Sequence, residues 1–137
     1  MKPKKTVLFV CIENACRSQM AEAFARMLGS DVIDPYSGGS QPSGKVNEKA
    51  MASMRKIGCD LRLQTSKGLD RIPNIEYDLL VTLGCGDACP TVPAKYREDW
   101  AIPDPKKMPM KQFDEVRDLI RHKVASLVAD LRPRLQI

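Results

Sequence analysis

Two side chains near the N-terminus have the types and the spacing of a nucleophile and an anion-binding group. Cys11 follows the apolar run at residues 6–10, and Arg17 lies six residues further on, ahead of a segment with helical character. A strand, a tight loop and a helix N-terminus in this order direct backbone N–H groups and the positive end of the helix dipole into the loop. The arginine adds paired N–H donors that suit a tetrahedral oxyanion. These surroundings favour the thiolate of Cys11, which is a nucleophile at neutral pH.

The rest of this loop supplies positions for holding the anion and the thiol. We expect the oxyanion to lie against the loop at Glu13, Asn14, Ala15, Cys16 and Arg17. Ser18 can donate its hydroxyl to the Cys11 sulfur, although a helix N-cap is an ordinary alternative for a serine there. Asn14 suits a left-handed turn. We interpret Cys16 as a packing residue, because the loop needs one nucleophile.

A carboxyl group with a fixed backbone follows much later in the chain. Asp104 stands between Pro103 and Pro105, which restrict the local conformation. A carboxylic acid aimed at the leaving oxygen of a bound oxyanion is a general acid. An ordinary turn aspartate explains the spacing equally well.

Cys85 and Cys89 form a second pair of residues that could do chemistry. Residues four apart in a helical turn lie at ~6 Å, within reach of a disulfide. A structural zinc site needs two further ligands, and the single histidine, His122, lies far away and off the apolar face of its helix. We therefore favour thiol redox chemistry with no metal and no cofactor. Cys59 is expected to be a buried filler.

The elements that must position these residues alternate between strand and helix. We predict strands at 6–10, 31–37, 77–83 and 98–102, and helices at 19–28, 47–57 and 110–131. Asn47 caps the second helix, and Ser66 caps a short helix that ends at Arg71. The alternation indicates one α/β domain over residues 1–137, a three-layer sandwich with helices on both faces of a four-stranded parallel sheet. Ligands bind at the carboxyl ends of such strands, where Cys11, the Cys85 loop and Asp104 should converge.

Composition narrows the classes of partner. The chain has 137 residues and a net charge of +5, but no basic stripe interleaved with aromatic residues, so nucleic acid is disfavoured. No apolar run approaches membrane-spanning length, and the run after Lys5 stops at Glu13, too short for a signal peptide. Five cysteines fit thiol chemistry in a reducing compartment. We expect a cytoplasmic monomer without membrane partners.

With these residues in place, the chain resembles arsenate reductases of the thioredoxin-coupled class, which share the fold of low-molecular-weight protein tyrosine phosphatases. The resemblance is carried by CIENACRSQMAE at residues 11–22, YSGG at 36–39, GKVN at 44–47, Cys89-Pro90, and Trp100 with Asp104-Pro105. The chain departs from the family in having Glu13 where glycine is usual, and we expect that carboxylate to point to solvent. Its two later cysteines are also closer together than in the best-known members.

Some relatives bind potassium beside the anion loop, and the resemblance implies the same place here. Asn14, Glu22 and Ser37 match ligand positions of that site, whereas Lys67 stands where a carboxylate is expected. Our hypothesis is that the Lys67 ammonium takes the place of the cation and pairs with Glu22.

The resemblance also implies a reaction. Cys11 attacks arsenate held by Arg17 while Asp104 protonates the departing hydroxide. Cys85 and then Cys89 resolve the product, and thioredoxin reduces the final disulfide. Phosphate or sulfate should bind as an analogue of arsenate.

Three other interpretations remain open at this point. A phosphatase needs Cys11, Arg17 and Asp104 but neither Cys85 nor Cys89. A thiol redox sensor or metal-binding module needs no arsenate. A reductase could also draw electrons from a low-molecular-weight thiol or glutaredoxin.

Overall fold

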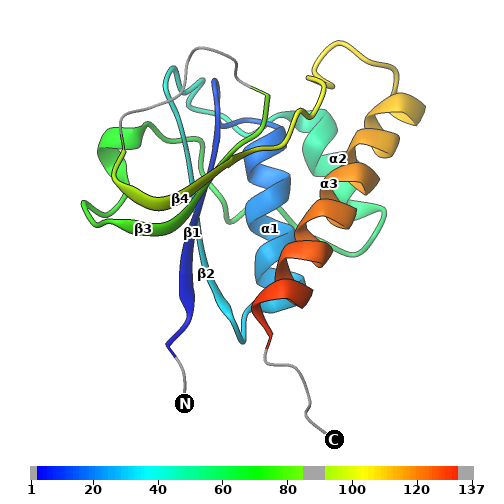
Figure 1. Cartoon of the computed structure of the whole chain (residues 1–137). Helices are drawn as coiled ribbons and strands as arrows, with labels where there is room; N and C mark the ends of the chain where they lie inside the picture. Colours follow the sequence, from blue (N-terminus) through cyan, green and yellow to red (C-terminus); the bar gives the residue numbers. More distant parts are fainter. Residues whose placement is uncertain (1–2, 85–91, 133–137) are drawn as a thin grey trace, which may run out of the picture.

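The computed structural model describes residues 3–84 and 92–132 of the chain (Figure 1). Its elements, in chain order, are β1 (Lys5–Cys11), α1 (Arg17–Gly29), β2 (Ile33–Gly39), α2 (Glu48–Arg55), the short 3-10 helix η1 (Leu69–Arg71), β3 (Tyr77–Thr82), β4 (Ala94–Asp99) and α3 (Met110–Leu131). Within this described part, no helix is both long and apolar enough to cross a membrane.

The four strands form one parallel sheet in the order β2-β1-β3-β4. This confirms the predicted α/β class and the four-stranded parallel sheet. The central strand β1 ends at Cys11, which pairs with Gly39 of β2, and the backbone N–H of Leu83 donates to the Val10 carbonyl. The carboxyl ends of three strands therefore surround Cys11, as parallel topology requires.

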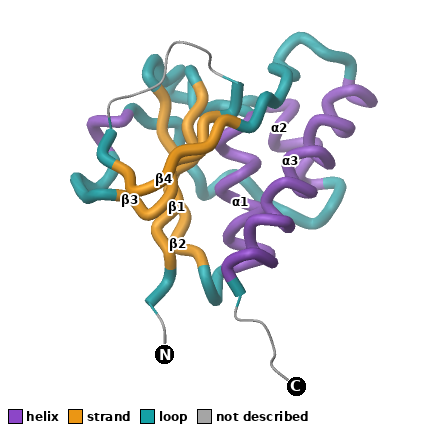
Figure 2. Tube along the Cα trace, in the orientation of Figure 1, coloured by secondary structure: helices purple, strands orange, loops and turns teal. Residues whose placement is uncertain are grey.

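The two faces of the sheet are covered differently. Helices α1, α2 and α3 lie on one face of the sheet (Figures 1 and 2). The alternate β1 residues Val7, Phe9 and Cys11 belong to the core between this face and the helices. Leu8 and Val10 point to the other face, which the described chain covers with η1 and the adjoining loops. We predicted helices on both faces of the sheet. Among the described residues, the only helix on this second face is the single turn of η1.

Two sequence-based elements were wrong. The fourth strand was predicted at residues 98–102, but β4 spans Ala94–Asp99. It is an edge strand whose residues are mostly polar and exposed. The buried side chains of Trp100 and Ile102, which suggested a strand, instead pack into the core from the segment after it, where Trp100 contacts Phe9. Ser66 does not cap η1, whose N-cap is Gly68.

Other elements match the prediction apart from their ends. Helix α3 spans the predicted residues, and His122 lies on its exposed face. The Asn47 side chain caps α2 by accepting from the N–H groups of Lys49 and Ala50. Helix α1 begins at Arg17, earlier than predicted, so Ser18 lies inside the helix and is not its N-cap. Cys59 was predicted to be buried, but it is only half-buried and packs against the edge of the core.

Glycine at the end of α1 allows the close packing of α1 against α3. A Cβ atom added to Gly29 would stand 2.5 Å from Cγ2 of Val128. We predict that Gly29→Ala lowers the free energy of unfolding by about 1–3 kcal/mol through overpacking. Urea denaturation should measure this loss, and Val128→Ala in the same chain should recover part of it. An unchanged midpoint in the single variant would show that the two helices separate at little cost.

Candidate anion-binding active site

The loop between β1 and α1 surrounds a pocket of about 80 Å³. That space is far below the size of a pocket for an organic ligand, so it suits a small ion. Glu13 and Ala15 line this pocket, and in the described part of the chain no backbone acceptor takes a hydrogen bond from their N–H groups. Asn14, between them, is fully buried and does not line the pocket. The pocket is lined by Cys11, Ile12, Glu13, Ala15, Cys16, Arg17, Asp104 and Lys106.

The conformation of this loop depends on two special positions. Asn14 has a φ of 50°, the left-handed conformation that the sequence predicted. A Cβ atom on Gly39 would lie 2.5 Å from the Ile12 carbonyl oxygen, so the loop can fold over the end of β2 only because this residue is glycine.

Arg17 is buried and ties three segments together. Its Nη1 donates to the carbonyl oxygens of Leu83 at 2.6 Å and Ile102 at 3.0 Å. Its Nη2 lies 3.9 Å from a carboxylate oxygen of Asp104. One side of the guanidinium is thus held by the scaffold, and the other side borders the pocket.

A chain of hydrogen bonds runs through the interior to the Cys11 sulfur. Ser18 Oγ lies 2.8 Å from Cys11 Sγ and accepts from Asn14 Nδ2 at 2.7 Å. The backbone N–H of Lys67, which can only donate, bonds to Asn14 Oδ1, so the Asn14 amide nitrogen must face Ser18. Because Ser18 already accepts from Asn14, its own proton is available to the sulfur, and it stabilises a thiolate there.

This chain extends to two glutamines that the sequence analysis missed. Gln19 Nε2 donates to Asn14 Oδ1 at 2.9 Å, and Gln64 Nε2 donates to Gln19 Oε1 at 2.7 Å. Gln19 lies within a motif that carried the family resemblance, but Gln64 is 45 residues away in sequence and had no signal. Together the two amides fix the orientation of Asn14.

The second cysteine of the loop has different surroundings. Burial raises the pKa of the Cys16 thiol to about 12, with further contributions from the Asp104 carboxylate and from Cys11. Cys16 is therefore a neutral thiol at physiological pH, which fits the interpretation of it as a packing residue.

Two carboxylates stand at the mouth of the pocket. Asp104 accepts from the backbone N–H of Lys106 and is more than half exposed. The Glu13 carboxylate also reaches solvent, as expected, but it is paired with Lys106, whose Nζ lies 2.8 Å from Glu13 Oε2. Lys106 is a further site residue that the sequence analysis missed.

The proposed cation position lies next to the loop. Lys67 Nζ is 3.7 Å from Glu22 Oε1, 3.3 Å from Ser37 Oγ and 3.2 Å from the Thr65 carbonyl oxygen. Ser37 in turn donates to Glu22, and Arg26 pairs with the other carboxylate oxygen of Glu22. An ammonium group therefore lies among oxygen atoms, and its role as a built-in cation remains a hypothesis.

Cys85 and Cys89 lie outside the described residues, so their predicted roles stay predictions. Gly84, which directly precedes Cys85, has a positive φ of 83°. Its N–H faces Asp99 Oδ1, which also accepts from the Thr82 hydroxyl. The chain thus turns sharply just after Leu83, whose carbonyl bonds to Arg17.

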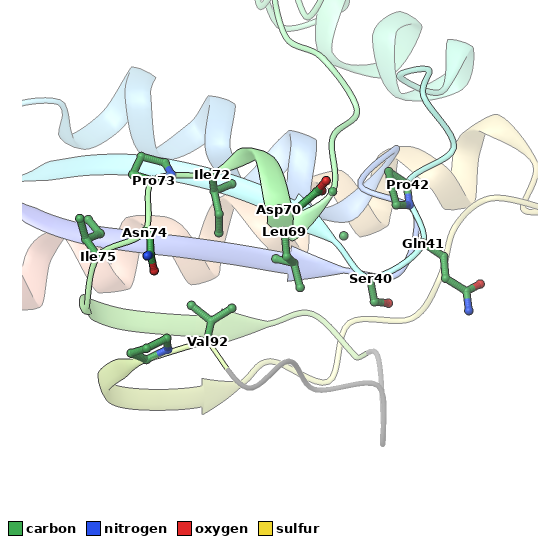
Figure 3. Close-up of a pocket in the computed structure, with 13 residues that line it drawn as sticks. Ser40, Gln41, Pro42, Leu69, Asp70, Ile72, Pro73, Asn74, Ile75 and Val92 are labelled. Carbon is green, nitrogen blue, oxygen red and sulfur yellow. The ribbon is translucent and has the colours of Figure 1, made fainter.

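A larger groove lies on the opposite face of the sheet, lined by η1, the end of β2 and the segments that precede β3 and β4 (Figure 3). Its volume is about 1030 Å³, and among the described residues that line it Asp70 is the one ionisable residue and none is a cysteine. The small pocket, which is lined by Cys11 and Arg17, is therefore the candidate reaction site.

Comparison with known proteins agrees with this geometry. Residues 6–136 match the low molecular weight phosphotyrosine protein phosphatase family, to which the chain belongs. Its relatives within that family include arsenate reductases. Arsenate reductase 2 of Staphylococcus haemolyticus is 40% identical over 127 residues, covering 90% of this chain and 95% of the relative.

Two solved structures extend this similarity. An arsenate reductase in a phosphate-binding state superimposes with a TM-score of 0.84 at 37% identity, covering 93% of this chain and 99% of that one. A thioredoxin-dependent arsenate reductase of Corynebacterium glutamicum has a TM-score of 0.76 at 25% identity, covering 95% of this chain and 63% of that one.

The hydrogen bond from Ser18 predicts the reactivity of Cys11. Ser18→Ala should slow alkylation of Cys11 by iodoacetamide at pH 7 roughly tenfold, because a bond to a charged acceptor is lost. Peptide mass spectrometry should follow Cys11, with Cys16 unmodified. Ser43→Ala, in an exposed loop, serves as the control. Equal rates in all three proteins would mean that Ser18 does not stabilise the thiolate.

The position of Lys67 predicts a response to cations. The wild-type chain should gain no more thermal stability from potassium chloride than from sodium chloride. Lys67→Ala should lower the free energy of unfolding by about 1–3 kcal/mol, since Glu22 loses one of its two cationic partners in the described chain and keeps Arg26. This variant should then be stabilised more by potassium than by sodium. Marked stabilisation of the wild type by potassium over sodium would refute the hypothesis.

Proposed function

We propose that this protein reduces arsenate to arsenite through a cascade of cysteine thiolates. The observation that carries the proposal is the Cys11 sulfur, hydrogen-bonded to Ser18 at 2.8 Å at the base of an ion-sized pocket bordered by Arg17. A thiolate there can attack the central atom of a tetrahedral oxyanion. The arsenate reductases among its relatives support arsenate as that oxyanion.

The first step forms a bond between Cys11 and arsenic. Backbone N–H groups of the loop and the free side of Arg17 hold the anion, and the Cys11 thiolate displaces one oxygen. Asp104, at the mouth of the pocket, donates the proton with which that oxygen leaves as water.

The second step transfers electrons. The Cys85 thiolate attacks the Cys11 sulfur, the sulfur–arsenic bond breaks, and both of its electrons remain on arsenic, which leaves as arsenite. The Cys89 thiolate then attacks Cys85 and releases Cys11. The chain is left with a Cys85–Cys89 disulfide and has supplied two electrons in all.

Thioredoxin is the proposed reductant of that disulfide. A dithiol donor suits an intramolecular disulfide, because its two thiols complete the exchange without a mixed product. The thioredoxin-dependent relative of Corynebacterium glutamicum supports this choice. The thiols of this chain require a reducing compartment, so we infer that the protein works in the cytoplasm. The monomeric state stays a prediction.

A coupled assay tests the function against its rivals. NADPH oxidation on addition of arsenate, with thioredoxin and thioredoxin reductase present, is expected to be sustained. Hydrolysis of an aryl phosphate by the same preparation should be a trace activity. Rapid hydrolysis without arsenate-dependent NADPH oxidation would identify a phosphatase. Oxidation that is independent of arsenate would indicate a thiol sensor. Arsenate reduction that is supported by glutaredoxin and not by thioredoxin would identify glutaredoxin as the electron donor.

The order of the cascade predicts how two variants fail. Cys11→Ser should abolish arsenite formation, because a serine hydroxyl stays protonated where a thiol ionises. Cys89→Ser should release about one arsenite per chain and then stop, because the Cys11–Cys85 disulfide has no resolving thiol. Rapid-quench detection of arsenite should distinguish the two, with Cys59→Ser as the control. Sustained turnover by Cys89→Ser with thioredoxin would exclude Cys89 as the last thiol.

A further inference from the structure

An ion pair crosses the mouth of the anion pocket. Glu13 comes from the loop after β1, and Lys106 comes from the segment between β4 and α3. Lys106 Nζ lies 3.0 Å from Glu13 Oε1 and 2.8 Å from Oε2, so it contacts both carboxylate oxygens. Both residues line the pocket together with Cys11 and Arg17.

The backbones of both partners are held in place. The Glu13 carbonyl accepts from the Ser43 N–H at 3.1 Å and from the Ser66 hydroxyl at 2.9 Å. The Lys106 N–H donates to Asp104 Oδ1 at 3.0 Å. Glu13 therefore stays at the pocket mouth, where the Lys106 side chain can reach it.

The charge of Glu13 is a problem for an anion pocket. A carboxylate at the mouth repels an incoming dianion. The two charges come close together there, so the repulsion acts at low salt and is screened at high salt. In the described part of the chain, Lys106 is the only cation paired with Glu13. Its ammonium cancels the charge at the place where the anion must pass.

We propose that Lys106 determines the affinity of this pocket for its oxyanion by neutralising Glu13. Lys106 is here a residue that sets affinity through Glu13, not a ligand of the anion. The proposal takes the class of anion, a tetrahedral dianion, from the proposed function. The binding test below does not require that any reduction occurs.

Isothermal titration with inorganic phosphate tests this on the full chain. Lys106→Gln should weaken binding by about three- to tenfold at low salt, because the Glu13 charge is left unpaired. Glu13→Gln should bind as tightly as wild type or more tightly. The double variant should return to within about twofold of wild type. In 1 M NaCl, where the Debye length is about 3 Å, the loss in Lys106→Gln should shrink to less than about twofold.

Lys107→Gln is the matched control, since this exposed neighbour loses the same charge but does not line the pocket. It should bind phosphate like wild type, and urea denaturation should show every variant folded. In arsenate reduction, Lys106→Gln should raise KM by a similar factor while kcat stays within about twofold, because a pair at the mouth acts on binding and not on the chemical step.

Several results would overturn the proposal. Unchanged phosphate affinity in Lys106→Gln would do so, as would an equal loss in Lys107→Gln. A double variant as weak as Lys106→Gln would show that the lysine binds the anion itself. Absence of phosphate binding by wild type would mean that the pocket is not an anion site. If the wild-type chain binds phosphate but fails to reduce arsenate, the proposed function falls and the ion pair stands.

Discussion

The hydrogen bonds from Arg17 to the Leu83 and Ile102 carbonyls hold this site together. They join the loop after β1, the end of β3 and the segment that leads to Asp104, three parts of the chain that are far apart in sequence. The guanidinium is buried, so a missing carbonyl would leave a charged donor without a partner at a cost of a few kcal/mol. Because Nη1 is held by these two carbonyls, the other side of the guanidinium borders the pocket.

That arrangement is equally suitable for a phosphatase and for a reductase. Both reactions begin with a thiolate attacking a tetrahedral oxyanion, and both benefit from an acid at the position of Asp104. The outcome depends on which group attacks next. In a phosphatase, water attacks the phosphoryl group bound to the cysteine and completes the hydrolysis. In a reductase, a second thiol attacks the Cys11 sulfur, and two electrons remain on arsenic. The assignment of the reaction therefore depends on Cys85 and Cys89 more than on the pocket that starts it.

The sequence predicted the parts of this structure that depend on local patterns. Helix α3 has a regular apolar face, and the Cys11–Arg17 loop stands between an apolar strand and a helical segment, so both were located correctly. The edge strand β4 has no apolar face to reveal it, and buried Trp100 and Ile102 drew the predicted strand to the wrong residues. The pairing of Lys106 with Glu13 and the contact of Gln64 with Gln19 join distant segments, so only the folded chain brings them together.

The central claim is that one chain supplies both electrons for each arsenate. A single turnover tests it directly: reduced protein is mixed with excess arsenate in the absence of any other reductant, and arsenite and free thiols are counted. The account predicts one arsenite per chain and the loss of two thiols, with a disulfide between Cys85 and Cys89 in the peptide map. Arsenite without thiol loss, or intact thiols with no arsenite, would contradict it.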